Sequence, residues 1–211
     1  MFNQLARKSW PVLVTVLLGF TIHQAVDASS KQATQPNQAP PPTIGTCSVF
    51  PADNPWNMVV TNLPVLANSP NYIASINANK QFLHADFGVD QLTGIPYVVV
   101  PGSQPKVPIT FTNYGDESDP GPYPVPLNAP VEAGGDRHVL TVDGDNCKLY
   151  ELYNADQVGA GWNADSGAIF DFTSNALRPL GWTSADAAGL PIFPGLVRYD
   201  EIQAGAINHA L

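Results

Sequence analysis

The chain has 211 residues, of which 44% are hydrophobic and 13% are charged, and its formal net charge is −9 at pH 7. This surplus of acidic groups argues against nucleic acid and anionic lipid as partners, because both require a basic face. Charged residues are sparse and apolar residues plentiful, which excludes the composition of a disordered chain.

Residues 1–28 have the layout of a secretory signal peptide. A basic pair, Arg7 and Lys8, precedes an apolar stretch that ends near Ile22, and small residues follow up to Ala28. The apolar stretch is shorter than the ~20 residues that a bilayer-spanning helix needs. We therefore expect a secreted or periplasmic protein that has no membrane attachment after signal cleavage.

The remainder divides into a tether and one domain. Residues 29–43 are polar, Ala or Pro and predict a disordered linker that is locally extended. Residues 44–211 are enough for a single domain with a real core. The chain stops in Asn208-His209-Ala210-Leu211, where an apolar segment begins, and we therefore expect the domain to be incomplete at its C-terminus.

The two cysteines, Cys47 and Cys147, are expected to form a disulfide in an oxidising compartment. A metal-binding pair or a reactive thiol is the alternative, but no histidine lies at ligand spacing from either cysteine.

Short β-branched and aromatic runs, separated by Gly and Pro, predict a mainly β fold, an antiparallel sandwich or jelly-roll-like domain with few short helices. A tight turn at residues 143–146 (DGDN) should join two of the strands as a hairpin, with Val139 and Leu140 on opposite faces. The predicted strands are residues 95–100, 107–111, 138–142, 148–153 and 168–172.

Helices are expected at residues 71–76 and at residues 183–188, the second ending at Gly189. The Pro-rich loop of residues 114–135 cannot be a central strand. It is either a binding feature or a structural wrap.

The densest polar cluster is Asp136-Arg137-His138 at the mouth of a predicted strand. Asp136 and His138 share one face and could act as an acid–base pair or as metal ligands. The alternative is structural: Asp136 caps the loop, Arg137 pairs with an acid, and His138 is a half-buried histidine with satisfied hydrogen bonds.

A second cluster joins Arg198, Asp200 and Glu201 to His209. If the strands that carry His138 and His209 are neighbours, both imidazoles would converge with Asp136, and Asp200 or Asp171 could complete a catalytic group. The alternative is that Asp200 caps a short helix that runs toward Gly205.

Several residues are candidates for substrate or ion binding. Trp162 and Trp182 lie beside Gly, Asn and Thr and could stack on sugar rings, as could Trp56, although such tryptophans more often complete a core. Acidic turns at residues 116–119 and 143–146 could hold a structural calcium, although turn chemistry explains both. The substrate-binding candidates are Arg137, Arg178, Arg198, Trp162 and Trp182.

The motifs GDRHVL, CKLYELYNA, SGAIFDF, GWTSADAAGLPIFPGLVRYDE and INHAL, taken together, resemble a family of secreted bacterial proteins to which no function is attached. The resemblance covers nearly all of the chain after the signal peptide. It implies that members continue past the HAL motif and that the shared polar positions are site candidates: Asp136, Arg137, His138, Asp171, Asn175, Arg178, Asp186, Arg198, Asp200 and His209.

Export, a β-rich fold, carboxylates and Trp/Asn/Gly loops favour a carbohydrate-directed protein, a glycoside hydrolase or lyase-like enzyme acting on a polysaccharide or cell-wall glycan. One alternative is a non-catalytic module that binds sugar or the cell envelope. Another is an exported metal-dependent hydrolase that uses His138, His209 and an acid. No cofactor is expected beyond the calcium considered above.

Overall fold

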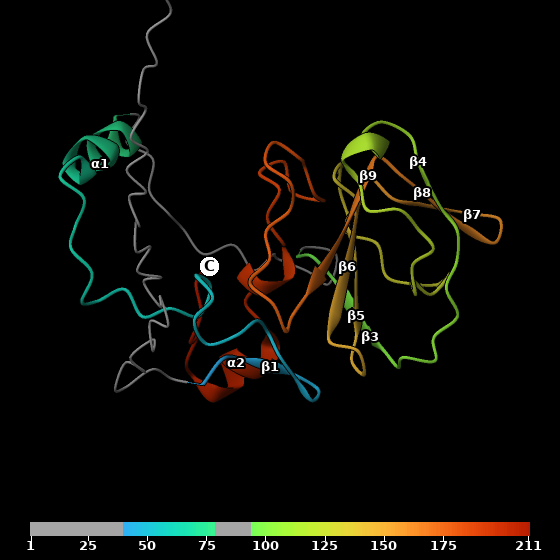
Figure 1. Ribbon diagram of the computed structural model, residues 1–211, viewed down its shortest axis with the longest axis horizontal. Coiled ribbons are helices and arrows are strands. Elements are labelled where there is room, and N and C mark those ends of the chain that lie inside the picture. The colour runs from blue at the N-terminus through green and yellow to red at the C-terminus, as the bar shows by residue number, and fades with distance from the viewer. Residues whose placement is uncertain (1–39, 79–93) are drawn as a thin grey trace, which may run out of the picture. The chain divides into compact units, whose positions relative to one another are not determined.

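A four-stranded sheet has a core cluster on each of its faces (Figure 1). The computed structural model describes residues 40–78 and 94–211, so the predicted signal peptide and residues 29–39 of the tether lie outside the described residues. The sheet has the order β3-β5-β6-β9, with strands β3 (Tyr97–Val100), β5 (Val139–Asp143), β6 (Lys148–Tyr153) and β9 (Ser166–Asp171).

The predicted hairpin is confirmed. Strands β5 and β6 pair antiparallel with Asp143 opposite Lys148, and the Asp143 carboxylate accepts the backbone N–H groups of Asp145 and Asn146 at 3.2 and 3.0 Å. An Asp at this position favours a tight turn because its side chain satisfies the turn's own N–H groups. Strand β9 continues the sheet antiparallel to β6.

The expected antiparallel sandwich is only partly correct, because the sheets have mixed orientation. Strand β3 is parallel to β5, and in a second sheet of order β4-β8-β7, strand β4 is parallel to β8. Parallel neighbours need a long connection, which the Pro-rich segment between β4 and β5 helps to supply. The second sheet comprises β4 (Ile109–Phe111), β7 (Asp156–Val158) and β8 (Gly161–Ala164), and a third pairs β1 (Thr43–Ile44) with β2 (Cys47–Ser48).

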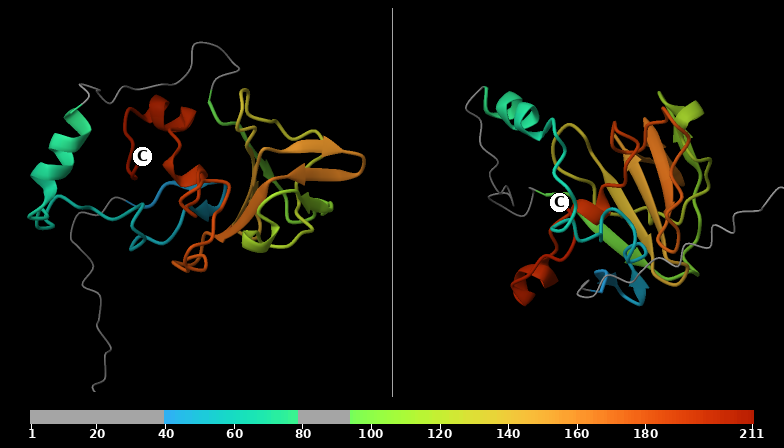
Figure 2. Two further views of the ribbon diagram at one scale, coloured as in Figure 1. Left: turned by 90° about the horizontal axis from the view of Figure 1, so that it is seen from above. Right: turned by 60° about the vertical axis from the view of Figure 1, so that its left-hand side comes forward.

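Both faces of the four-stranded sheet are buried. One face packs under residues from the N-terminal and C-terminal parts of the domain, including Phe50, Phe172 and Phe193. The opposite face packs against Trp162 and Tyr123. The predicted alternation is confirmed, since Val139 belongs to the second cluster while Leu140 and Val142 belong to the first. Figure 2 shows the strands of this sheet side by side, in green to orange.

The Pro-rich loop of residues 114–135 is a structural wrap. It contains a short 3-10 helix, η1 (Gly115–Glu117), and Tyr123 pairs with Val107 as an isolated bridge. Tyr123 and Val125 are fully buried against the sheet, so the loop completes the core. Of this loop, Tyr114 lines a cavity and could contact a ligand.

The predicted disulfide is confirmed: Cys47 and Cys147 are bonded, and their Cα atoms are 5.4 Å apart. The bond ties β2 to the turn of the β5–β6 hairpin. Such a bond indicates an oxidising, extracytoplasmic compartment. Within residues 40–78 and 94–211, no helix is long and apolar enough to cross a membrane.

Two of the three helices considered from the sequence form. Helix α1 (Ser69–Asn77) contains the predicted residues 71–76, and α2 (Tyr199–Ala204) ends at Gly205, whose φ of 69° suits a glycine C-cap. The N-cap of α2 is Arg198, so the expectation that Asp200 caps this helix is wrong.

The helix expected at residues 183–188 does not form. The Ser184 hydroxyl lies 2.8 Å from the Asp186 carbonyl and 2.6 Å from the Leu190 carbonyl, and these side-chain contacts hold the segment in turns. Serine competes with helical hydrogen bonds in this way. A second 3-10 helix, η2 (Phe193–Gly195), follows.

Candidate functional site

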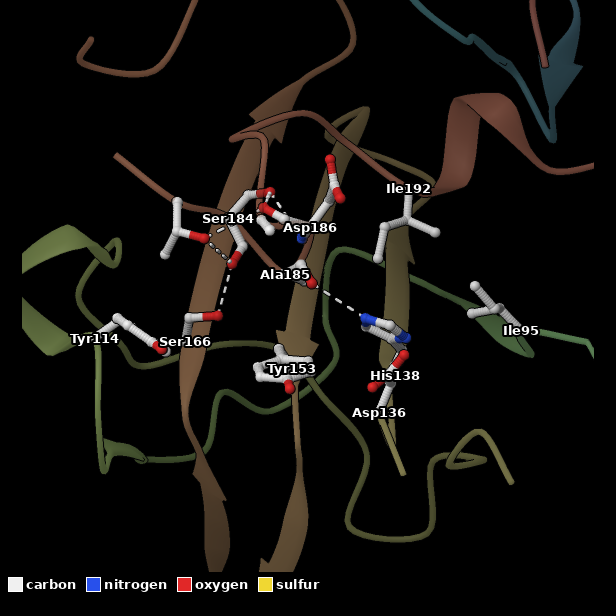
Figure 3. A pocket seen from close by; sticks show the side chains of 12 residues that line it. Ile95, Tyr114, Asp136, His138, Tyr153, Ser166, Ser184, Ala185, Asp186 and Ile192 are labelled. Carbon is white, nitrogen blue, oxygen red and sulfur yellow. Dashed lines mark hydrogen bonds between the residues drawn. The ribbon is translucent and has the colours of Figure 1, made fainter. Parts of the chain in front are cut away.

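A cavity of about 460 Å³ opens at one end of the four-stranded sheet (Figure 3). Its floor and walls come from strand ends, and its roof comes from residues 183–187 and Ile192. The lining residues are Ile95, Tyr114, Asp136, His138, Tyr153, Ser166, Thr183, Ser184, Ala185, Asp186, Ala187 and Ile192.

Strand register explains why polar side chains meet at this end of the sheet. Tyr153, the last residue of β6, lies opposite Ser166, the first residue of β9. His138 immediately precedes β5, and strand alternation places it on the same face as Leu140. The rings of His138 and Tyr153 are 5.7 Å apart between centroids. Three neighbouring strands thus supply a histidine, a tyrosine and a serine to one face.

The roof is held to the sheet by hydrogen bonds. The Ser166 hydroxyl donates to the Ser184 carbonyl at 2.6 Å, and the His138 Nε2 atom lies 3.1 Å from the Ala185 carbonyl oxygen. Figure 3 shows these two contacts crossing the cavity from the strands to the roof segment. The Thr183 N–H donates to the Glu117 carboxylate at 2.8 Å. The cavity therefore has a fixed outline.

His138 is a positioning residue in this arrangement. Its Nδ1 atom lies 2.5 Å from Glu132 Oε2, and its Nε2 atom faces the Ala185 carbonyl. Both ring nitrogens are therefore occupied by protein oxygens. The residue is 8% exposed. The structural alternative for His138 is the one that these contacts support.

Four other lining side chains have free polar groups. Asp136, Asp186, Tyr114 and Tyr153 have no hydrogen-bond or ion-pair partner for their carboxylate or hydroxyl groups among the residues that the structure describes. The serines and the histidine of the lining are internally satisfied. The two carboxylates and two phenols are thus the groups that remain for a ligand.

A buried acid lies behind the cavity wall. The Glu151 carboxylate, in the middle of β6, accepts the backbone N–H groups of Ile192 and Phe193 at 2.9 to 3.0 Å. Burial, together with the smaller effect of the Asp186 charge, raises the pKa of Glu151 to about 7, against the lowering effects of those two hydrogen bonds and of the Arg178 charge. This side chain fixes Ile192, a residue of the roof.

Each of the three arginines expected to bind substrate forms an ion pair with an acidic residue of the same chain. Arg137 pairs with Asp156 and donates to the Ala155 carbonyl, as the structural alternative requires. Arg178 pairs with Asp119 and also donates to the Glu117 and Thr183 carbonyls. Arg198 is 2% exposed and pairs with Glu201. None of the three lines the cavity.

The tryptophans behave mostly as core residues. Trp162 is 2% exposed and belongs to the core cluster beneath the sheet, so the interpretation that it stacks on a sugar is wrong for this structure. Trp182 is half-buried, with the Arg178 guanidinium 5.7 Å from its ring centre. Trp56 packs against the opposite core cluster.

The structure shows no contact that joins His209 to His138. His209 lies in a segment without a described strand, near the end of the chain, where its Nε2 atom is 2.9 Å from Glu201 Oε1. Asp200 is exposed on α2 and does not line the cavity, whereas Asp136 does. The expected group of two imidazoles with Asp136 and Asp200 is not formed, because no strand carries His209 beside β5.

No group of three His, Cys, Asp or Glu side chains within residues 40–78 and 94–211 is placed to hold a metal ion. The 143–146 turn uses its own carboxylate, since Asp143 Oδ2 accepts the Asn146 side-chain amide at 2.8 Å. Turn chemistry accounts for this acidic turn. In the other acidic turn, residues 116–119, the Asp119 carboxylate forms an ion pair with Arg178.

The sequence did not mark Glu132, Tyr114, Tyr153 or Ser166 as site residues. For Tyr153 the signal was present in part, because the β5–β6 register places the end of β6 beside the start of β5 once the turn is known. Ser166 arrives through the pairing of β9 with β6, and β7 and β8 lie between these two strands in the chain. Glu132 lies in the Pro-rich loop, and nothing in the sequence marks it as the partner of His138. Comparison with protein-family models, curated proteins and solved structures finds no match to this chain.

Proposed function

We propose that this chain is an exported protein that binds carbohydrate in the cavity at the end of its central sheet. The observation that carries the proposal is a set of groups on one cavity that have no partner among the described residues: the hydroxyls of Tyr114 and Tyr153 and the carboxylates of Asp136 and Asp186. Sugar hydroxyls need donors and acceptors in fixed positions, and aromatic rings supply flat apolar surface beside them.

Binding is favoured over catalysis by the state of His138. A general base must present a free nitrogen to the substrate, whereas both nitrogens of this ring are occupied by Glu132 and Ala185. Ser166 and Ser184 also donate to backbone carbonyls, and no base lies on either hydroxyl among the described contacts. These side chains shape the cavity and hold its roof.

The test is direct binding of the exported full chain to a panel of soluble oligosaccharides, measured by calorimetry. We expect Tyr153→Phe, which removes only a hydroxyl, to weaken binding by about tenfold, because an unpaired sugar hydroxyl is left in the cavity. Tyr72→Phe is the matched control, since Tyr72 is exposed on α1. Absence of binding to every oligosaccharide, or equal binding by the Tyr153 variant, would refute the proposal.

A glycoside hydrolase is the second candidate, because Asp136 and Asp186 line the same cavity and hydrolysis uses a pair of carboxylates. Product release from the oligosaccharides that bind, lost in both Asp136→Asn and Asp186→Asn, would favour this candidate over simple binding. The metal-dependent alternative is less well supported, because the structure shows no contact between His138 and His209.

A further inference from the structure

We infer that the cavity selects a glycan that carries free amino groups, an oligomer of the glucosamine type, over N-acetylated and uronic acid glycans. This inference rests on the proposed carbohydrate binding and names its ligand class. It follows from the charge of the lining: Asp136 and Asp186 are its acids, and the described lining contains no Lys or Arg.

The arginines nearest the cavity pair with acids outside its lining. Arg137 pairs with Asp156, and Arg178 pairs with Asp119. No arginine pairs with Asp136 or Asp186 among the described residues. The cavity therefore has an excess of negative charge that a ligand can complement.

The field of Asp186 is felt inside the protein as well. Its charge contributes to the raised pKa of the Glu151 carboxyl, after the larger effect of burial. Glu151 holds the roof residue Ile192 by its backbone N–H. The Arg178 charge acts on Glu151 in the opposite direction, but its guanidinium pairs with Asp119 and Arg178 does not line the cavity.

This arrangement distinguishes three kinds of sugar. A protonated amine donates charge-assisted hydrogen bonds to a carboxylate, which are stronger than those between neutral groups. An acetamido group offers one neutral N–H in its place, and a uronate brings a second negative charge into an acidic cavity. The Tyr114 and Tyr153 hydroxyls can form hydrogen bonds with the ring hydroxyls that all three kinds of sugar share.

The experiment compares glucosamine, N-acetylglucosamine and uronic acid oligomers of equal length on the exported full chain, by calorimetry at mildly acidic pH and low salt. We expect the glucosamine oligomer to bind about tenfold or more tightly than the N-acetylated one, and the preference to shrink with added salt. Asp136→Asn and Asp186→Asn should each reduce the preference, whereas Asp200→Asn, on α2 outside the cavity lining, should leave it unchanged.

The outcomes separate the two proposals. Equal affinity for amino and N-acetylated oligomers, or a preference for uronate, would overturn the amino-sugar inference and leave carbohydrate binding standing. A chain that binds none of the oligomers would overturn both. Thermal unfolding of each variant shows whether it is folded, and both Asp→Asn changes keep the size of the side chain. A folded variant with an unchanged preference for the glucosamine oligomer would also count against the inference.

Discussion

The hairpin at the centre of the sheet and helix α1 both carry apolar side chains at regular spacing, yet only the hairpin buries them. All five residues of β5 are buried, as are the middle four of β6. In α1 no residue is buried, and Tyr72, Ile73 and Ile76 are 56, 54 and 57% exposed.

The difference lies in what each segment contacts. The hairpin is flanked by β3 and β9 and has a core cluster on each face, one completed by Phe172 and Phe193 and the other by Tyr123 and Trp162. Helix α1 begins with Pro70 in its first turn, where the fixed φ of proline suits a helix start. Local sequence therefore suffices to form an element, but the stability of the fold depends on the elements that contact one another.

The largest expected effect comes from the bond that ties the N-terminal segment to the hairpin. Replacing both Cys47 and Cys147 by Ala should lower the free energy of unfolding by roughly 4–5 kcal/mol, because the disulfide closes a loop of 100 residues in the unfolded chain. Denaturant titration of the oxidised protein and the double variant measures this. A loss below about 1 kcal/mol would mean that the hairpin and its two clusters are stable without the crosslink.

Truncation of one side chain in each region tests the comparison itself. Leu152→Ala, at a fully buried position of β6, should cost about 3 kcal/mol through lost burial and a cavity. Ile73→Ala on α1 is the matched control and should stay within about 0.5 kcal/mol. Equal losses for the two variants in chemical unfolding would contradict the exposure of α1.

The buried acid of the hairpin predicts how stability depends on pH. Burial raises the pKa of Glu151 from 4.5 to about 7 in the folded protein. Below about pH 4.5 the carboxyl is protonated in both states. As pH rises toward about 7 the unfolded chain ionises first, so the folded state loses stability, by at most about 3 kcal/mol.

Glu151→Gln removes the ionisation and should abolish this slope, while one amide oxygen continues to accept a backbone N–H. Unfolding titrations at a series of pH values, for the parent chain and the variant, provide the measurement. Parallel pH profiles would show that another group is responsible.

The smallest effect is expected for the ion pair between Arg137 and Asp156, whose side chains are 38% and 62% exposed. Arg137→Ala should change the free energy of unfolding by about 1 kcal/mol or less, because water and salt screen such pairs. It should also leave glycan binding intact, since Arg137 does not line the cavity. Loss of binding in a stably folded variant would restore the substrate-binding interpretation of this arginine.

Features that depend on neighbours in the chain were predictable from the sequence. The β5–β6 hairpin follows from one turn, and the alternation of Val139 and Leu140 follows from strand geometry. Helix α2 ends at Gly205, and a glycine is a common helix C-cap. The Cys47–Cys147 bond follows from the compartment, because only two cysteines are present.

Features that depend on distant partners were decided by the tertiary structure. The parallel pairing of β3 with β5 and of β4 with β8 depends on contacts across the fold. The same is true of the cavity. The shared polar positions included Asp136, Asp186 and the arginines alike. The structure pairs Arg178 with Asp119, 59 residues away, and gives Asp136 and Asp186 no partner among the described residues. Charge pairing is settled by distance in space, and the order of residues along the chain does not determine that distance.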